Sequence, residues 1–401
     1  MCGTLVTTAI AERAEPKPAL SGFQFASVLV LALCAHALYW STRPPDMSIF
    51  LEPWFAHIVH YGPIAAFAHP FSNYEPAYLY LLAAGSLGHE LLAPITIIKL
   101  LSVAGSLFLT FDVANLLRTL GAPARLAVFT LVLPTVIINA ALLGQCDALW
   151  AGACVLALAA MMRGETVRSL VWCGLAFAFK SQAAFIAPVI IGAMIGRRAP
   201  LWQWAIPPAA FAATLVPAWL AGWPLGKLLM VYPGQAALVQ FAGKLGNPWI
   251  AATIFADQAS RSYFVVGYAA AIAAAIAIAA LAARSIRDRN ALLLLALVSA
   301  TALPFLLPKM LERYYFLADV LSLVLALSAG TRPAIRIAIA VQLASLISLL
   351  TYIYWYHWPY PALAGAGFAA AALAGMLSLL RASGIEALNQ PRAASLSIRS
   401  A

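Results

Sequence analysis

The chain has 401 residues, of which 64% are hydrophobic and only 9% are charged. An average soluble domain is about 45–50% apolar and about 25% charged, so this chain has too few charged side chains to cover a surface that faces water. Its composition therefore excludes a soluble globular protein and places most of the chain in a lipid bilayer. The net charge of +10 would favour nucleic-acid binding only if the charges formed a patch, so their positions along the chain decide its meaning.

Apolar segments of about the length of a bilayer crossing recur along the chain, and such a crossing needs roughly 20 residues of helix. They predict an all-α, polytopic integral membrane protein with about 12 transmembrane helices, folded as a single membrane domain over residues 1–401. The predicted spans are 23–40, 95–117, 126–142, 147–162, 168–179, 182–196, 201–222, 263–284, 290–307, 314–330, 334–353 and 361–381.

The orientation of these spans follows from Lys and Arg, which favour short cytoplasmic loops. With the N-terminus inside, 16 of the 24 basic residues fall in inner segments. Topology thus explains most of the positive charge, and we expect no nucleic-acid partner. The same orientation makes 1–22 and 382–401 cytoplasmic, and makes 41–94 and 223–262 the two large extracytoplasmic loops.

Two segments need a separate interpretation. Residues 76–92 are apolar, but a further crossing there would reverse every later loop, so we expect interfacial helices within loop 41–94 that do not cross. The spans 168–179 and 182–196 are short and are joined through Phe179-Lys180-Ser181-Gln182. A lysine at membrane depth is costly unless it faces a watery cavity, so this break predicts such a cavity near the outer face.

No nucleotide-binding pattern occurs in the chain, neither a phosphate-binding G-x-x-x-x-G-K-[ST] loop nor a G-x-G-x-x-G turn. This argues against an ATP-driven pump and against a transferase with its own nucleotide-sugar domain. The unusual carboxylates, amides and histidines fall in the outer half of the predicted topology. If the protein is an enzyme, we expect its active site on the extracytoplasmic face.

Asp46 follows Arg43-Pro44-Pro45 at the exit of the first predicted span. Aspartate there is a favoured helix N-cap, and it is equally a carboxylate that can take a proton from an acceptor hydroxyl; the pattern alone leaves both interpretations open. His57 and His60 share a helix face, but zinc needs three or four ligands. We therefore interpret them as an interfacial polar face and predict no metal site.

Two further polar stretches lie on the outer side. Gly144-Gln145-Cys146-Asp147 joins two predicted spans, and Asp147 is either a cap of the second span or a site residue. In the stretch 308–315, Lys309, Glu312 and Arg313 break the inward bias of basic residues. The two cations suit a phosphate, although side chains that snorkel to the lipid headgroups would have the same pattern.

Five stretches taken in chain order resemble one family of membrane enzymes. They are PPDMSIFLEPW, PFSNYEPAYLYLL, GQCDALW, GLAFAFKSQAAFIAPV and LPKMLERYYFLADVL, and they run from residue 44 to about residue 322. Together they resemble the C-type fold (GT-C) of glycosyltransferases that use polyprenyl-phosphate sugars, most of all bacterial polytopic mannosyltransferase-like proteins and more distantly the dolichyl-phosphate-glucose-dependent glucosyltransferases.

The resemblance implies an inverting transfer of a hexose from a polyprenyl-phosphate donor to a hydroxyl of a glycan or lipid acceptor. The reaction would take place outside the bacterial inner membrane, among membrane lipids. The sequence requires no cofactor for it and leaves the use of a divalent metal open.

The resemblance also implies roles for individual residues. Asp46 matches the essential aspartate of the family's first outer loop and would be the general base. The family's Tyr-Pro-Pro turn reads Tyr74-Glu75-Pro76 here, and its late histidine-glutamate-basic motif reads Leu311-Glu312-Arg313, without the histidine. The predicted donor phosphate-binding residues are Lys309, Arg313 and Lys180, and the predicted supporting residues are Glu312, Tyr74, Glu75, Gln145, Asp147 and Gln182.

A transporter or a lipid or oligosaccharide flippase is the alternative, because many spans and a broken helix carrying Lys180 suit it as well. Against it, the two halves of the chain show no repeat. A non-catalytic scaffold for polysaccharide export is a third interpretation, and it predicts that the outer polar residues tolerate alanine without loss of glycan.

Overall fold

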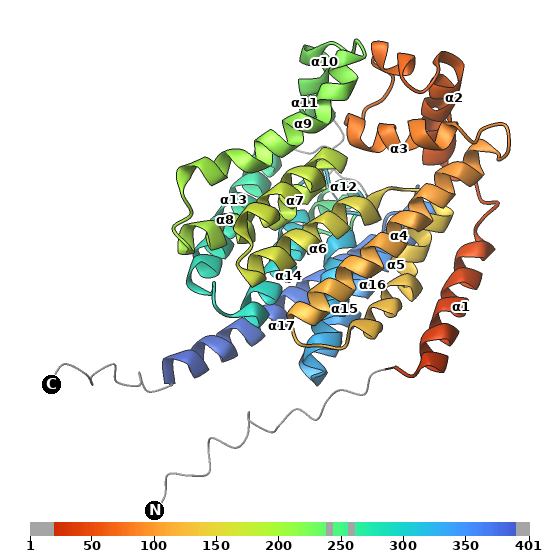
Figure 1. Ribbon diagram of the computed structural model, residues 1–401. Helices are drawn as coiled ribbons and strands as arrows, with labels where there is room; N and C mark the ends of the chain where they lie inside the picture. Colours follow the sequence, from red (N-terminus) through yellow and green to blue (C-terminus); the bar gives the residue numbers. More distant parts are fainter. Residues whose placement is uncertain (1–19, 238–243, 256–260, 390–401) are drawn as a thin grey trace, which may run out of the picture. The chain divides into compact units, whose positions relative to one another are not determined.

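The computed structural model describes residues 20–237, 244–255 and 261–389. Every regular element in these ranges is a helix, and no strand occurs in them (Figure 1). The predicted all-α class is therefore confirmed. The expected cytoplasmic segments 1–22 and 382–401 lie largely outside the described residues, apart from a few residues at the start of the first helix and the last turns of the last one.

Each of the twelve predicted spans falls on helix, but the helices differ in length. Five helices of the described part are long and apolar enough to cross a membrane, or six if a bent pair counts as one span. The bent pair is Ala124–Val132 with Pro134–Leu142, which meet at 60°. The protein is a multi-pass membrane protein, and the count of twelve crossings stays a prediction because the other ranges hold shorter helices.

The chain forms two compact units, and each is described by itself. Unit 1 comprises Met1–Ala183 and Trp202–Ala237, and unit 2 comprises Ala184–Leu201 and Leu238–Ala401. A single membrane domain over the whole chain stays a prediction. The helices of unit 1 are α1 (Gly22–Leu38), η1 (Met47–Leu51), α2 (Glu52–Tyr61), η2 (Ala65–Ala68), α3 (Pro76–Ser86), α4 (Pro94–Thr119), η3 (Ala124–Val132), α5 (Pro134–Ile137), η4 (Ile138–Leu142), α6 (Asp147–Arg163), α7 (Thr166–Phe179), α9 (Ile206–Leu220), α10 (Leu225–Leu229) and α11 (Val231–Ala237).

The helices of unit 2 are α8 (Ala187–Gly196), α12 (Pro248–Phe255), α13 (Arg261–Arg284), α14 (Arg289–Leu306), α15 (Phe316–Ala329), α16 (Arg332–Tyr354) and α17 (Pro361–Asn389). Two 3-10 helices, η5 (Ser181–Ile186) and η6 (Leu201–Ala205), contain boundaries between the units. α3 has 11 residues, about half of what a crossing needs, which fits the expected interfacial helix in the first outer loop.

Local sequence sets where the central helices of unit 1 begin and end. α4 starts at Pro94, because proline suits the first helical position, where no intrahelical partner for its N–H is needed. α6 ends at Gly164 with φ 88°, a left-handed conformation that glycine adopts without strain. α4 packs beside α6, and α6 beside α7 (Figure 1).

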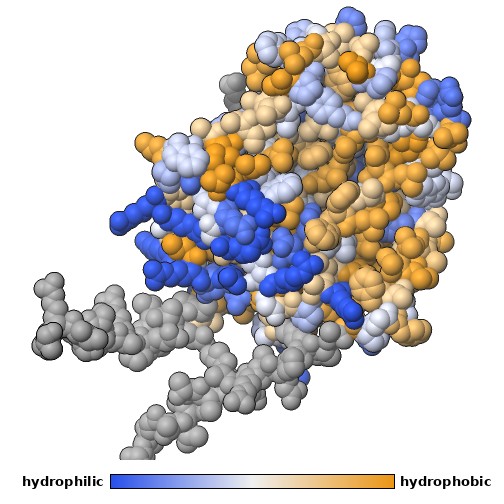
Figure 2. Space-filling model, viewed as in Figure 1, coloured by the Kyte–Doolittle hydropathy of each residue, from blue (hydrophilic) through white to orange (hydrophobic). Residues whose placement is uncertain are grey.

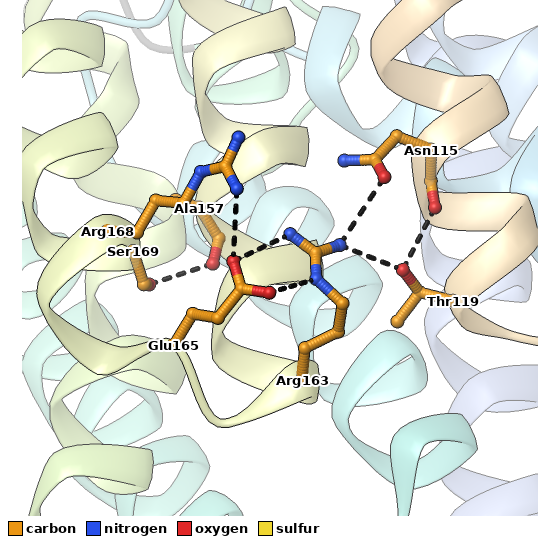
Figure 3. Close-up of polar contacts among 7 residues, drawn as sticks. All are labelled: Asn115, Thr119, Ala157, Arg163, Glu165, Arg168 and Ser169. Carbon is orange, nitrogen blue, oxygen red and sulfur yellow. Dashed lines mark hydrogen bonds and ion pairs between the residues drawn. The ribbon is translucent and has the colours of Figure 1, made fainter.

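Polar contacts fix the turn between α6 and α7 (Figure 3). The Arg163 guanidinium donates to Glu165 at 2.7 Å and to the Thr119 hydroxyl at 3.0 Å, and so ties this turn to the end of α4. The Ser169 hydroxyl donates to the Ala157 carbonyl at 2.8 Å. Hydrogen bonding to Glu165 raises the pKa of Arg163, and the same pairing lowers the pKa of Glu165. These contacts thus hold the end of α6 and the start of α7 together at the turn.

The surface is apolar as the composition requires. Much of the face in Figure 2 is hydrophobic, with hydrophilic side chains gathered in limited regions. On α4, for example, Phe108 is 67% exposed and Phe111 is 64% exposed. Such side chains face the acyl chains of a bilayer at no cost, since lipid is as apolar as a protein core.

Candidate functional site

Five sequence-predicted residues of unit 1 meet in one largely buried polar network: Asp46, Tyr74, Gln145, Asp147 and Lys180. Its first member, Asp46, lies just before η1 and has helical backbone angles, φ −58° and ψ −34°. Although it stands at the N-cap position of η1, its side chain makes no capping hydrogen bond. Instead the Asp46 carboxylate accepts a hydrogen bond at 3.1 Å from the amide of Gln145, which lies 99 residues later.

Gln145 links Asp46 to the rest of the network. Its amide oxygen accepts hydrogen bonds from the Tyr74 hydroxyl at 3.1 Å and from the Lys180 ammonium at 3.3 Å. Because the amide oxygen is thus occupied by two donors, the amide nitrogen is turned toward Asp46. The preceding Gly144 has φ 65°, and a Cβ there would come within 2.5 Å of the Met47 side chain. Glycine at 144 therefore lets the Gln145 turn pack directly on the helix that follows Asp46.

The centre of the network is a buried ion pair. The Lys180 ammonium lies 2.6 Å from Asp147 Oδ1, and both side chains are almost fully buried, 6% and 3% exposed. Asp147 also accepts from Asn139 at 2.6 Å and from the Trp150 indole at 2.9 Å. Paired charge and several hydrogen bonds are what a carboxylate needs to stay ionised in an apolar interior.

Helix ends and π-helical segments position several side chains of this network. α7 ends at Lys180, whose backbone is extended at φ −156°, ψ 145°, so the lysine leaves the helix and turns inward. Asp46 precedes the π-helical segment η1, and Asn139 lies within the π-helical segment η4. π-helical turns are rare and are frequently found at functional sites. The only two in the described residues both carry members of this network.

Glu75 and Gln182 have unsatisfied buried polar atoms. Glu75 is 1% exposed, and its Oε2 has no hydrogen-bond partner among the described residues. Burial raises the pKa of Glu75 to about 7, so near neutral pH this carboxyl is partly protonated and able to donate or accept a proton. The Gln182 Oε1 is likewise buried without a partner in the described part of the chain. The chain therefore carries a titratable group directly after Tyr74.

The start of the expected second outer loop, 223–262, contacts residues near the network of unit 1. The Tyr232 hydroxyl of α11 donates to the Phe177 carbonyl at 2.5 Å, and the Gln235 amide donates to the Asn73 carbonyl. Burial is the main cause that raises the pKa of Tyr232, so this phenol stays protonated. The contacts attach the start of loop 223–262 to the turn that carries Tyr74.

The remaining predicted residues lie in unit 2, at the turn between α14 and α15. Arg313 pairs with Glu312 at 3.4 Å, and both side chains are largely buried. Lys309 has φ 66° and holds its ammonium 5.3 Å from the centre of the Phe264 ring. The Tyr315 hydroxyl donates to the Gly246 carbonyl at 2.9 Å, which ties this turn to the residues just before α12.

Lys244 was not predicted as a site residue. Its ammonium lies 4.7 Å from the centre of the Tyr356 ring. Burial lowers the pKa of Lys244, and the Glu312 carboxylate partly opposes that shift. Lys244 is therefore within electrostatic reach of the Glu312–Arg313 pair. Its place in an irregular loop left no periodicity from which this could have been found.

Lys99, Asn139 and Trp150 were missed. Lys99 lies on α4 and is 0% exposed, and its ammonium donates to the carbonyls of Tyr39, Trp40 and Thr42 at 2.6, 3.0 and 2.7 Å. Lys99 thereby fixes the residues that follow α1 and lead to Asp46. The available signal was a lone lysine inside a predicted apolar span, which is costly unless it is paired.

His57, one of the two histidines interpreted above as an interfacial polar face, contacts an aromatic ring and a backbone carbonyl. The His57 ring stacks on Phe71 with centroids 4.4 Å apart, and its Nε2 is 3.1 Å from the Ala66 carbonyl. Within the described ranges, no group of three or more His, Cys, Asp or Glu side chains is placed to hold a metal ion.

Comparison with known proteins found a structural similarity but no similar sequence. No family profile matches the chain, and no curated protein sequence matches it. Among solved structures, it is similar to ArnT from Cupriavidus metallidurans, whose crystal structure is bound to undecaprenyl phosphate. The TM-score is 0.42 at 16% sequence identity, over 91% of this chain and 80% of that one. At this TM-score the likeness transfers no residue and no role.

Proposed function

We propose that the protein is a glycosyltransferase of the bacterial inner membrane. It would transfer a hexose, with inversion, from a polyprenyl-phosphate donor to a hydroxyl of a glycan or lipid acceptor on the extracytoplasmic face. The observation that carries the proposal is the Asp46 carboxylate, which the Gln145 amide holds at 3.1 Å at the edge of a network containing a buried ion pair. The order of the five sequence stretches that resemble GT-C enzymes supports the same activity.

The proposed glycosyl transfer needs only cations near the phosphate and one carboxylate near the acceptor hydroxyl. A phosphate leaves as a stable anion, so cations suffice to stabilise it and no general acid is needed. One carboxylate then takes the proton of the acceptor hydroxyl while the oxygen attacks the anomeric carbon from the opposite face. The C–O bond to phosphate breaks as the new glycosidic bond forms. Asp46 is the proposed base.

The buried pair behind Asp46 fixes its orientation. Lys180 and Asp147 hold each other at 2.6 Å, and Lys180 together with Tyr74 fixes the Gln145 amide. A general base must lie within hydrogen-bond reach of the proton that it removes, and a side chain locked in one rotamer meets that requirement at little entropic cost.

Lys309, Arg313 and Lys180 are the proposed donor phosphate-binding residues. Lys180 would have to exchange part of its contact with Asp147 for a phosphate oxygen, whereas Lys309 and Arg313 occupy a turn of unit 2 beside Glu312. We assign supporting roles to Glu312, Tyr74, Glu75, Gln145, Asp147 and Gln182.

The test is a direct transfer assay. Purified protein is incubated with a panel of radiolabelled prenyl-phosphate hexoses and a lipid extract of the host, and label in new glycolipid or glycan is measured. We expect one donor to support transfer. Movement of the intact labelled lipid across proteoliposome membranes, with no transfer from any donor, would contradict the proposal and favour the flippase alternative.

A further inference from the structure

In unit 2, α8 and α13 pack with their backbones in contact. A Cβ at Gly192 would come within 2.2 Å of the Ala279 carbonyl oxygen, and one at Gly196 within 2.2 Å of the Ala283 carbonyl oxygen. Contact residues increase together along both helices, so the two helices run parallel. The C-terminal ends of α8 and α13 therefore lie side by side.

Arginines gather at this shared end. Arg197 and Arg198 follow the last residue of α8, α13 ends at Arg284, and α14 begins at Arg289 after a short turn that contains Arg287. All except the half-buried Arg197 are exposed. The one acid in these segments, Asp288, caps α14 by accepting from the Ala291 N–H at 3.0 Å.

Arg198 occupies a position where its backbone is unfavourable. Its φ is 53°, the left-handed conformation in which helices usually end on glycine, and a residue with a Cβ is strained there. The chain thus carries an exposed guanidinium where glycine would be more stable.

Exposed apolar side chains precede the arginines on the same two helices. Ile195 of α8 is 54% exposed, Ile276 of α13 is 65% exposed and Leu281 of α13 is 43% exposed. A free phosphate would use the arginines alone. An amphiphile with an anionic head and acyl chains would use both surfaces.

We propose that the joined ends of α8 and α13, with Arg198, Arg284 and Arg287 as the main contacts, bind the phosphodiester headgroup of an anionic phospholipid. Guanidinium groups donate paired hydrogen bonds to phosphate oxygens and stay charged at any physiological pH. Basic sites between membrane helices bind anionic headgroups, and each cation near the surface strengthens that attraction. The site is in unit 2 and is independent of the proposed transferase reaction.

Native mass spectrometry of the full chain in detergent tests the proposal. The protein is titrated with dioleoylphosphatidylglycerol and separately with dioleoylphosphatidylcholine. For the unmodified protein we expect about tenfold or tighter binding of the anionic lipid, and for the triple variant Arg198→Gly, Arg284→Gln, Arg287→Gln a preference reduced to within about twofold. Arg198→Gly relieves the backbone strain, so lost binding cannot be ascribed to lost folding, and the apparent Tm should not fall.

The matched control removes the same number of exposed arginines from unit 1, as Arg118→Gln, Arg125→Gln, Arg168→Gln. It should keep the preference for the anionic lipid, which separates a local site from the overall positive charge. An unchanged preference in the triple variant of unit 2, or an equal loss in the control, would overturn the proposal. So would glycerol 1-phosphate displacing the lipid at equal concentration, because the ligand would then be a phosphate without chains.

Discussion

At the scale of single residues, the Lys180–Asp147 pair has the largest energetic consequence. Both groups are buried 2.6 Å apart, and removing one partner leaves a charge in the interior without compensation, at a cost of about 3–5 kcal/mol. We expect Lys180→Met to lower the free energy of unfolding by that amount in a denaturant titration. The double variant Lys180→Met, Asp147→Asn should recover part of it, since the uncompensated charge is gone.

The matched control for this pair is on the surface. Arg43 pairs with Glu52 at 2.8 Å, but the arginine side chain is 61% exposed, and exposed pairs contribute about 0–1 kcal/mol. Arg43→Met should therefore change stability by less than 1 kcal/mol. Equal losses in Arg43→Met and Lys180→Met would show that Lys180 is not held in a dry interior.

Glu75 should make stability depend on pH. Its pKa is raised by burial to about 7 from an ordinary 4.5, so the folded protein binds this proton more tightly than the unfolded chain does. The stabilising effect is complete below about pH 4.5 and is lost as the pH rises through about 7. We expect the apparent Tm to fall over that window, and Glu75→Gln to remove that part of the fall.

The same substitution should change stability at the upper end of the window and not at the lower end. At pH 8 the glutamine variant should be more stable than the unmodified protein by a few degrees, because no charge is buried there. At pH 4.5 the two should agree. If Glu75→Gln leaves the pH profile of the Tm unchanged, the Glu75 carboxyl does not titrate in this window.

Lys99 shows how a distant residue supports the Asp46 segment. Its ammonium ties three carbonyls of residues 39–42, a few residues before Asp46. We expect Lys99→Met to lower kcat of the transferase about tenfold or more, while the KM for the donor changes little, because a misplaced base slows the chemical step. Lys99→Arg keeps the donors and should restore part of kcat. A pure rise in KM would contradict a positioning role.

At the scale of elements, the sequence predicted helices well. Runs of apolar residues bounded by proline and glycine, such as Pro94 at the start of α4 and Gly164 at the end of α6, carry their own start and stop signals. The bend between η3 and α5 and the π-helical segments η1 and η4 were not predicted. The bend falls where Pro134 begins α5 after the extended Leu133, and hydrophobic periodicity does not distinguish a π-helical turn from an α-helical one.

Close helix packing gives a prediction at this scale. Gly192 has the Ala279 carbonyl oxygen 2.2 Å from the place of a Cβ, and a backbone atom cannot move aside as a side chain can. Gly192→Val should push α8 from α13 and lower the apparent Tm by several degrees. Gly367→Ala on α17, where nothing lies within 4 Å of a Cβ, should leave the Tm unchanged or raise it slightly.

At the scale of the whole molecule, scarcity of charge made part of the site predictable. Asp46, Gln145, Asp147 and Lys180 were singled out because polar groups in an apolar chain must be paired or functional, and they do meet in one network. The geometry of that network was not predictable, because the side chains come from segments up to 134 residues apart. Asn139 was not predicted because it lies inside an apolar predicted span and no interruption of the hydrophobic pattern marks its position.

The central claim is that Asp46 is the base of a glycosyl transfer, and the most direct measurement compares label transfer by the unmodified protein and by Asp46→Asn. Asparagine keeps the side-chain shape and can still accept from Gln145, so folding should be unaffected while the rate falls about 10²–10⁴-fold. Asp288→Asn, which keeps a good helix N-cap, should transfer label normally. Near-normal transfer by Asp46→Asn would contradict the account.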